Sequence, residues 1–333
     1  MRRGLALALC LSACSPQEPP GTKADEAPPV PTPAAAPSLV PPSPSAPPTT
    51  ASGEPTSATP LTAFVAQKAK LVGHTSLVLK LEDGARHKAV FRPAFRQGGS
   101  RYRGEIAAYR LGVALGIGAH LAEAVPVSLP KEQLRGLLGD ADRARFDADA
   151  IVDDRGRVSG ALVRWIDDLD VPAFEKDPWV ARWKDWLQGD AAPASTEARL
   201  AAEFSSLVVF DYLTGNFDRW SGGNLGAVGT DAALSLRFID NDGAFLEPMP
   251  KAPLAASKQR LLSSRRFSRS FVERLRTLLK EPTWDAIFGL GADHAPLLPK
   301  AVVAGVRSRA EEAVAHVGAA SARSGEPAAL PFP

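Results

Sequence analysis

The sequence predicts an α+β fold with two lobes, a β-rich first lobe that contains one helix and a mainly helical second lobe that contains a small hairpin. Three observations lead to this prediction. Short β-rich runs between turn residues dominate residues 61–166. Apolar residues at helical spacing dominate residues 167–320. Within that helical pattern, residues 225–239 hold two short β-rich runs around Gly229.

In the first lobe we expect two hairpins and one helix. The predicted strands are residues 77–81 with 87–91, joined at Glu82-Asp83-Gly84, and residues 150–152 with 158–166. A helix is predicted over residues 103–115, because its apolar side chains favour one side and Gly116 follows it.

In the second lobe we expect four helices and the hairpin. The predicted helices are residues 172–187, 196–213, 269–279 and 300–317, and the predicted strands are residues 225–228 and 234–239. Tryptophan and phenylalanine side chains recur in the first two helices at helical spacing, a pattern that is typical of a hydrophobic core.

The N-terminus has the pattern of an export signal. Met1-Arg2-Arg3 precedes a short apolar run that is too short to span a membrane. The run ends in Leu11-Ser12-Ala13-Cys14, which resembles the lipobox of bacterial lipoproteins. The resemblance implies that residues 1–13 are removed and that Cys14 receives the lipid that anchors the chain to a membrane. The alternative is an ordinary signal peptide that is cut elsewhere.

Residues 14–60 are dominated by Pro, Ala, Ser and Thr and lack the apolar side chains that a core requires, so we expect a disordered tether. The tail, residues 321–333, has a similar composition, and we expect it to be disordered too. The net charge is +2, which gives little support to nucleic-acid binding. Arg265, Arg266, Arg269, Arg274 and Arg276 form a local basic stretch. Such a stretch is most often a solvated helix face; an acidic or phosphate-rich substrate surface is the other interpretation.

Three short motifs carry the polar side chains of a candidate site. The first is Lys88-Ala89-Val90-Phe91-Arg92-Pro93, and the second is the helical segment 103–111, which contains Glu105 among apolar neighbours. The third is Asn216-Phe217-Asp218-Arg219, followed by Asn224 and by Asp240-Asn241-Asp242-Gly243 after the small hairpin. No Gly-x-Ser-x-Gly elbow and no zinc-type histidine spacing are present, which disfavours serine hydrolases and zinc hydrolases.

These motifs, in this order, resemble the secretory-pathway kinases of the Four-jointed and Golgi casein kinase group, which are related to HipA-like and phosphatidylinositol 4-kinases. The resemblance covers about residues 88–245. It implies an atypical protein-kinase-like fold of two lobes, with ATP and Mg²⁺ or Mn²⁺ as cofactors.

The resemblance also implies the roles of individual residues. Asp218 would orient or deprotonate the acceptor hydroxyl, Asp240 would ligate the metal ion, and Asn224 would give a second metal contact. Glu105 would pair with the cation on the first strand. Relatives have Lys at the position of Arg92, so either Arg92 contacts the nucleotide phosphates or Lys88, on the same strand face, replaces it. Asp242 is a second candidate ligand, and Arg219 is expected to brace the loop.

We therefore expect an exported, membrane-anchored kinase that transfers the γ-phosphoryl group of ATP to a hydroxyl acceptor. Protein Ser or Thr is the favoured acceptor, and a glycan or lipid is the alternative. The competing hypothesis is a pseudokinase that binds nucleotide or protein, because Arg92 departs from the lysine of the relatives. We expect a monomer in the cell envelope, at the outer membrane or the periplasmic face in preference to the inner membrane.

Overall fold

The structure, a computed structural model, describes residues 60–73, 76–191, 193–282 and 284–333. The described residues form one compact unit. The predicted signal peptide, Cys14 and the tether up to residue 59 lie outside the described residues and stay predictions. Among the helices of the described part, none combines the length and the apolar character that a bilayer crossing requires.

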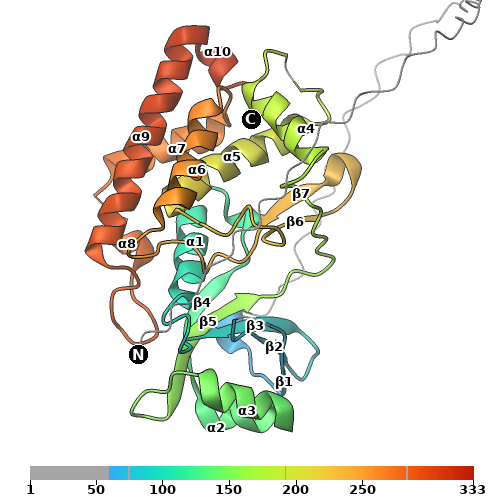
Figure 1. Ribbon diagram of the computed structural model, residues 1–333, viewed down its shortest axis with the longest axis vertical. Helices are drawn as coiled ribbons and strands as arrows, with labels where there is room; N and C mark the ends of the chain where they lie inside the picture. Colours follow the sequence, from blue (N-terminus) through green and yellow to red (C-terminus); the bar gives the residue numbers. More distant parts are fainter. Residues whose placement is uncertain (1–59, 74–75, 192, 283) are drawn as a thin grey trace, which may run out of the picture. The chain divides into compact units, whose positions relative to one another are not determined.

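The first lobe is built on a five-stranded antiparallel sheet with the strand order β1-β2-β3-β5-β4 (Figure 1). The strands are β1 (Lys68–Leu71), β2 (Leu79–Glu82), β3 (Lys88–Pro93), β4 (Ala124–Pro130) and β5 (Arg157–Arg164). Because side chains alternate along a strand, Ala89 and Phe91 of β3 are buried on one face, and Val90 and Arg92 lie on the other.

Each face of this sheet supports a different hydrophobic core. On one face, Phe91 packs with Leu134 of α2 (Lys131–Leu137) and Phe146 of α3 (Asp140–Asp149). On the other face, Ala161 and Val163 of β5 join α1 (Tyr102–Ala114) in the larger core. Arg92 therefore lies on the sheet face that meets α1 and the second lobe.

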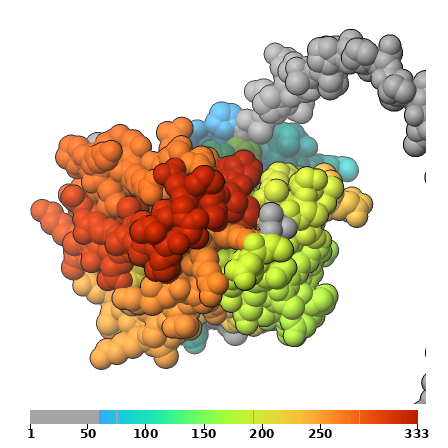
Figure 2. All heavy atoms as spheres, turned by 90° about the horizontal axis from the view of Figure 1, so that it is seen from above, coloured from blue at the N-terminus to red at the C-terminus, as the bar shows by residue number. Residues whose placement is uncertain are grey.

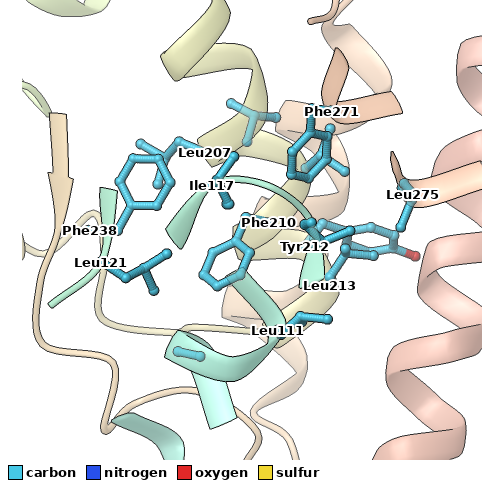
Figure 3. Packing of buried hydrophobic residues seen from close by; sticks show 14 of the residues in the cluster. Leu111, Ile117, Leu121, Leu207, Phe210, Tyr212, Leu213, Phe238, Phe271 and Leu275 are labelled. Atoms are coloured by element: carbon cyan, nitrogen blue, oxygen red, sulfur yellow. The ribbon is translucent and has the colours of Figure 1, made fainter. Parts of the chain in front are cut away.

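The second lobe is assembled around α5 (Ala198–Thr214), in which every residue from Leu200 to Thr214 is buried. Phe210 and Leu213 of α5 pack with Leu111 of α1 and Phe238 of β7 in the same core (Figure 3). The other helices are α4 (Trp179–Gln188), α6 (Lys251–Ser263), α7 (Arg269–Lys280), α8 (Trp284–Phe288), α9 (Lys300–Ser324) and α10 (Glu326–Ala329). The core thus continues from the first lobe into the second through α1.

The small hairpin is formed by the two strands that come next after α5. Gly215, with a φ of 62°, ends the helix in the left-handed conformation that glycine adopts at low cost. The loop of residues 216–224 then leads into β6 (Leu225–Val228), which pairs with β7 (Ser235–Phe238) as a two-stranded antiparallel sheet. Asp240 and Asp242 lie in the loop that follows β7.

Several expected elements differ in the structure. Strand β5 pairs with β3 and β4, not with residues 150–152, because the predicted hairpin considered only neighbours in sequence. Among its described residues, the first lobe has three α-helices where one was expected. Helices α2 and α3 were missed because they carry few apolar residues and bury mainly Leu134 and Phe146. The helix expected from residue 172 begins at Trp179.

The expectation of a disordered tail is wrong. Helix α9 continues to Ser324, α10 follows, and Leu330 and Phe332 are each 2% exposed. The backbone N–H of Arg269 donates to the carbonyl of Phe332 at 3.0 Å, and the Ser268 hydroxyl donates to the carbonyl of Pro333 at 2.7 Å. Two large apolar side chains are sufficient to dock a segment whose overall composition is that of a linker.

Candidate active site

The candidate site is centred on Arg92 of β3, which contacts three carboxylates from two other parts of the chain. Its Nε lies 3.2 Å from Oε1 of Glu105 on α1. Its Nη1 lies 3.0 Å from Oδ1 of Asp240 and 3.3 Å from Oδ2 of Asp242, both in the loop after β7. The Arg92 side chain is only 15% exposed. We call these four residues the Arg92 cluster.

Glu105 ties helix α1 to the loop after β7. The backbone N–H of Asn241 donates to Oε1 of Glu105 at 2.8 Å, and the Asn241 side chain donates to Oε2 at 3.4 Å. Gly104 permits this approach, because a Cβ there would lie 2.5 Å from the carbonyl oxygen of Asn241. The residue before Glu105 must therefore be glycine for the helix to reach the loop in this geometry.

The Arg92 cluster carries an excess of negative charge. Burial raises the pKa of Glu105, and the neighbouring Arg92 opposes this increase. Burial, and then the charge of Asp240, raises the pKa of Asp242 to about 6. Burial disfavours the charge of Arg92, but the three carboxylates raise its pKa well above the ordinary value, so it stays cationic. One guanidinium thus faces three acids.

Asp218 lies against the same loop. A Cβ built on Gly243 would lie 3.3 Å from Cβ of Asp218 and 3.1 Å from Oδ1 of Asn216. The side chain of Asn216 accepts a hydrogen bond from the backbone N–H of Asp218 at 3.1 Å, which fixes the turn. Within the described residues, the Asp218 carboxylate has no hydrogen-bond partner and is available to a ligand.

Arg219 braces this region, as expected from the sequence. Its side chain is fully buried, and Nε lies 3.2 Å from Oδ1 of the buried Asp211. The rest of the guanidinium donates to the carbonyls of Asn224 and Ile239 and to Oδ1 of Asn241. A single side chain therefore joins α5, the Asp218 loop and the loop that carries Asp240.

A cleft of about 490 Å³ opens beside the Arg92 cluster, and Arg92, Glu105 and Asp240 line one part of it. Its remaining wall is mostly apolar and comes from both lobes: Val90, Ala122, Val163, Trp165, Ile166, Leu169, Phe238 and Ile239. A mainly apolar cleft with a few convergent charged groups is typical of a small-molecule site.

The structure decides between Lys88 and Arg92, which the sequence left as alternatives for the cation of the site. Lys88 lies four residues before Arg92, about 13 Å along an extended strand, and is exposed. Its Nζ is 6.0 Å from the centre of the Trp165 ring, and Lys88 does not line the cleft. Arg92, not Lys88, contacts Glu105 and Asp240.

Asn224 lies next to Asp218 but not in the Arg92 cluster. Its side-chain nitrogen donates to the carbonyl of Asp218 at 2.9 Å. The predicted metal contact would use the amide oxygen, and it stays a prediction.

Sequence reasoning gave no role to two polar residues of this region. Asn241 connects Arg219 to Glu105 through both its backbone and its side chain. Arg101 lies with its guanidinium 5.3 Å from the centre of the Phe217 ring, and its charge lowers the pKa of Asp242. Neither had a local signal, since the role of each depends on contacts far away in sequence.

The donor set fits a divalent cation. Asp240 and Asp242 offer oxygen ligands, which Mg²⁺ and Mn²⁺ prefer, and the cluster has two negative charges more than Arg92 neutralises. In the described part of the chain, no group of three or more His, Cys, Asp or Glu side chains is gathered as a ready metal site. This agrees with the position of Arg92 between Glu105 and the two aspartates.

Comparison of the fold with solved structures finds kinases. A Golgi casein kinase with Mn and ADP bound aligns with a TM-score of 0.58 and 14% identity, over 78% of this chain and 74% of that one. A second Golgi casein kinase structure gives a TM-score of 0.59 at 14% identity, over 80% and 74%. Fam20 from hydra, solved with sugar, gives 0.54 at 14% identity, over 78% and 87%.

Sequence comparison adds no closer relative. No protein-family model matches the chain, and no curated protein matches it either. The likeness to the solved kinases therefore concerns the fold. The mixed helix and sheet architecture, with its antiparallel five-stranded sheet, is the protein-kinase-like fold of the Golgi casein kinase structures.

Proposed function

We propose that this chain is an exported, membrane-anchored kinase that transfers the γ-phosphoryl group of ATP to a hydroxyl acceptor, with Ser or Thr of a protein as the favoured acceptor. The observation that carries the proposal is the Arg92 cluster, which lies at the cleft next to the loop of Asp218. Three separate segments place a cation and several carboxylates at one end of an apolar cleft, in a kinase-like fold.

Each residue has a distinct part in this reaction. The apolar wall around Trp165 and Phe238 accommodates the base, and Arg92 contacts the phosphates. Glu105 and Asn241 hold Arg92 and the loop of Asp240 in register. Asp240, with Asp242 beside it, would hold the divalent cation, which neutralises phosphate charge and favours the departure of the γ-phosphoryl group.

Asp218 acts on the acceptor. Its carboxylate accepts the hydroxyl hydrogen of the acceptor and orients the oxygen toward the γ-phosphorus. The buried guanidinium of Arg219 and the hydrogen bond from Asn216 keep the loop of Asp218 in position. Positioning of this kind supplies most of the catalytic effect in phosphoryl transfer.

A pseudokinase that binds nucleotide or protein in the cell envelope is the second candidate function. One observation favours it: Nη1 of Arg92 contacts both Asp240 and Asp242, the two candidate metal ligands. The planar guanidinium of an arginine makes several fixed hydrogen bonds, whereas the ammonium group of a lysine makes one compact contact. Arg92 therefore competes with a metal ion for the oxygens of Asp240 and Asp242.

The experiment that tests the proposal is transfer of label from γ-labelled ATP by the full chain, with Mn²⁺ or Mg²⁺, to itself and to an envelope extract. The wild type is compared with Asp218→Asn and with Asp154→Asn, a matched change at an exposed aspartate in the turn before β5. Label that is lost only in Asp218→Asn supports the kinase. Equal labelling by all three proteins refutes the role of Asp218, and nucleotide binding without any label favours the pseudokinase.

The proposed anchor has a separate test. Cys14→Ser removes the thiol that would carry the lipid. We expect the variant to move from the membrane fraction to the soluble fraction, because two acyl chains at one residue account for stable attachment. A Cys10→Ser variant is the matched control and should keep the wild-type distribution. Retention of Cys14→Ser in the membrane fraction would contradict the lipid anchor.

A further inference from the structure

Three arginines of the second lobe surround a hollow of about 550 Å³ that lies apart from the cleft. Arg265 and Arg266 follow α6, and Arg323 lies in the last turn of α9. Gly189 and Asp190, which follow α4, also line the hollow. Figure 2 shows these parts side by side, with the surface of α9 and α10 in red next to the α4 region in yellow-green. We call this hollow the arginine pocket.

The backbone at the arginine pocket is fixed by hydrogen bonds. The backbone N–H groups of Arg265 and Arg266 donate to the carbonyl of Leu187 at 2.8 Å and 3.2 Å. The guanidinium of Arg266 donates to the carbonyls of Asp190 and Ala191, which holds it at the wall of the pocket. One of the three cations is thus preorganised, so a ligand does not have to order it.

The positive charge of the pocket is poorly neutralised. Nη1 of Arg265 lies 3.7 Å from Oδ1 of Asp190, whose side chain is fully exposed, and an ion pair of this kind contributes little. Arg323 is exposed and has no ion pair or hydrogen bond within the described residues. The negative end of the α9 dipole explains one basic residue in its last turn, but not three around one hollow.

The rest of the basic stretch does not share this character. Arg269 is bound to Glu326, with Nη1 2.6 Å from Oε1. The side chain of Arg274 extends along Gly116, on a different surface of the lobe. The tertiary structure therefore selects Arg265 and Arg266 from the stretch and adds Arg323, which is distant in sequence.

We propose that the arginine pocket binds the phosphate group of a small phosphate-bearing molecule. The guanidinium groups of Arg265 and Arg323 are available to donate to phosphate oxygens, and the fixed charge of Arg266 adds to the attraction for an anion of two or more charges. The pocket is concave, which favours a small ligand over a flat membrane surface. It has no lining residue in common with the cleft, so the proposal does not depend on kinase activity.

The test is calorimetric titration of the full chain with inorganic phosphate and with pyrophosphate. Wild type is compared with Arg323→Gln and Arg265→Gln, and with Arg276→Gln, which removes one charge of the same basic stretch outside the pocket. An Arg92→Gln variant separates binding at the arginine pocket from binding in the cleft, where Arg92 is proposed to contact phosphates. Far-ultraviolet circular dichroism shows whether each variant is folded.

We expect saturable binding that is about tenfold weaker in Arg323→Gln and in Arg265→Gln, the effect of losing one charge-assisted hydrogen bond. Affinity should be unchanged in Arg276→Gln, and one binding site should remain in Arg92→Gln. Equal affinity in Arg323→Gln and wild type, or absence of saturable binding, would overturn the proposal. Binding of a phosphoserine peptide without binding of phosphate or pyrophosphate would overturn it in favour of a phosphorylated polypeptide partner.

Discussion

Replacement of Asp242 by asparagine should stabilise the metal-free protein near neutral pH. The pKa of Asp242 is about 6 in the folded chain, against an ordinary value of 3.8. A raised pKa means that the folded state binds this proton more tightly than the unfolded state does. The stabilising contribution is complete below about pH 3.8 and is lost as the pH rises through about 6.

The size of the effect follows from the difference of about 2 pH units, at roughly 1.4 kcal/mol for each unit. Ionising Asp242 in the folded state therefore costs about 3 kcal/mol at about pH 7.5. Asparagine has a similar shape and no charge, and its amide oxygen can still accept a hydrogen bond from Arg92. We expect Asp242→Asn to raise the free energy of unfolding by between about 1 and about 3 kcal/mol at that pH.

The assay is urea unfolding of the full chain with a metal chelator, followed by tryptophan fluorescence at about pH 7.5 and about pH 4.5. The gain should shrink to about 1 kcal/mol or less at the lower pH, where Asp242 is mostly protonated in the folded state and no longer carries most of the cost of ionisation. Asp154→Asn, at an exposed turn, is the control and should change little. A variant less stable than wild type at the higher pH, or a gain independent of pH, would refute the electrostatic account of the cluster.

Three further predictions concern the packing that holds the site. Gly104→Ala should destabilise the protein by about 1–3 kcal/mol in urea unfolding, because its Cβ would lie 2.5 Å from the Asn241 carbonyl oxygen. The control, Gly136→Ala, should be neutral or stabilising, because its Cβ would meet no atom within 4 Å. Equal effects of the two substitutions would contradict the close approach. Arg219→Met should lower the free energy of unfolding by about 3–5 kcal/mol and abolish label transfer, since it leaves the Asp211 carboxylate buried without its ion-pair partner. A variant as stable as the wild type would contradict the structural role of Arg219. Phe332→Ala should lower the free energy of unfolding by about 3–5 kcal/mol and make the C-terminal segment sensitive to proteolysis. If this segment were a free tail, the substitution would change neither stability nor proteolysis.

The sequence was sufficient for the elements whose signals are local. The hairpin of β2 and β3 formed at its turn residues, and α1, α5 and α7 formed where apolar residues recur with helical period. Their ends were predicted to within two residues, since glycine and turn residues interrupt the pattern there. The same reasoning failed for α2 and α3, which are mostly polar and owe their stability to a few buried contacts with the sheet.

The candidate site was foreseen in part. The sequence named Arg92, Glu105, Asp218 and Asp240, and the structure brings Arg92 into contact with Glu105 and Asp240 and places Asp218 against their loop. It could not choose between Lys88 and Arg92, because the period of two gives both the same strand face. Only the distance along the strand, together with the position of α1, separates them.

What the sequence alone determined is therefore the position of the elements that have a local signal, and the identity of the chemical groups, since propensity, turn chemistry and side-chain type are local properties. The tertiary structure decided which of these groups meet. It paired β5 with β3 and β4, docked Phe332 beside α7, and gathered Arg265, Arg266 and Arg323 around one hollow. Such contacts join residues far apart in the chain, and their free energy comes from shared burial and charge, which no local pattern records.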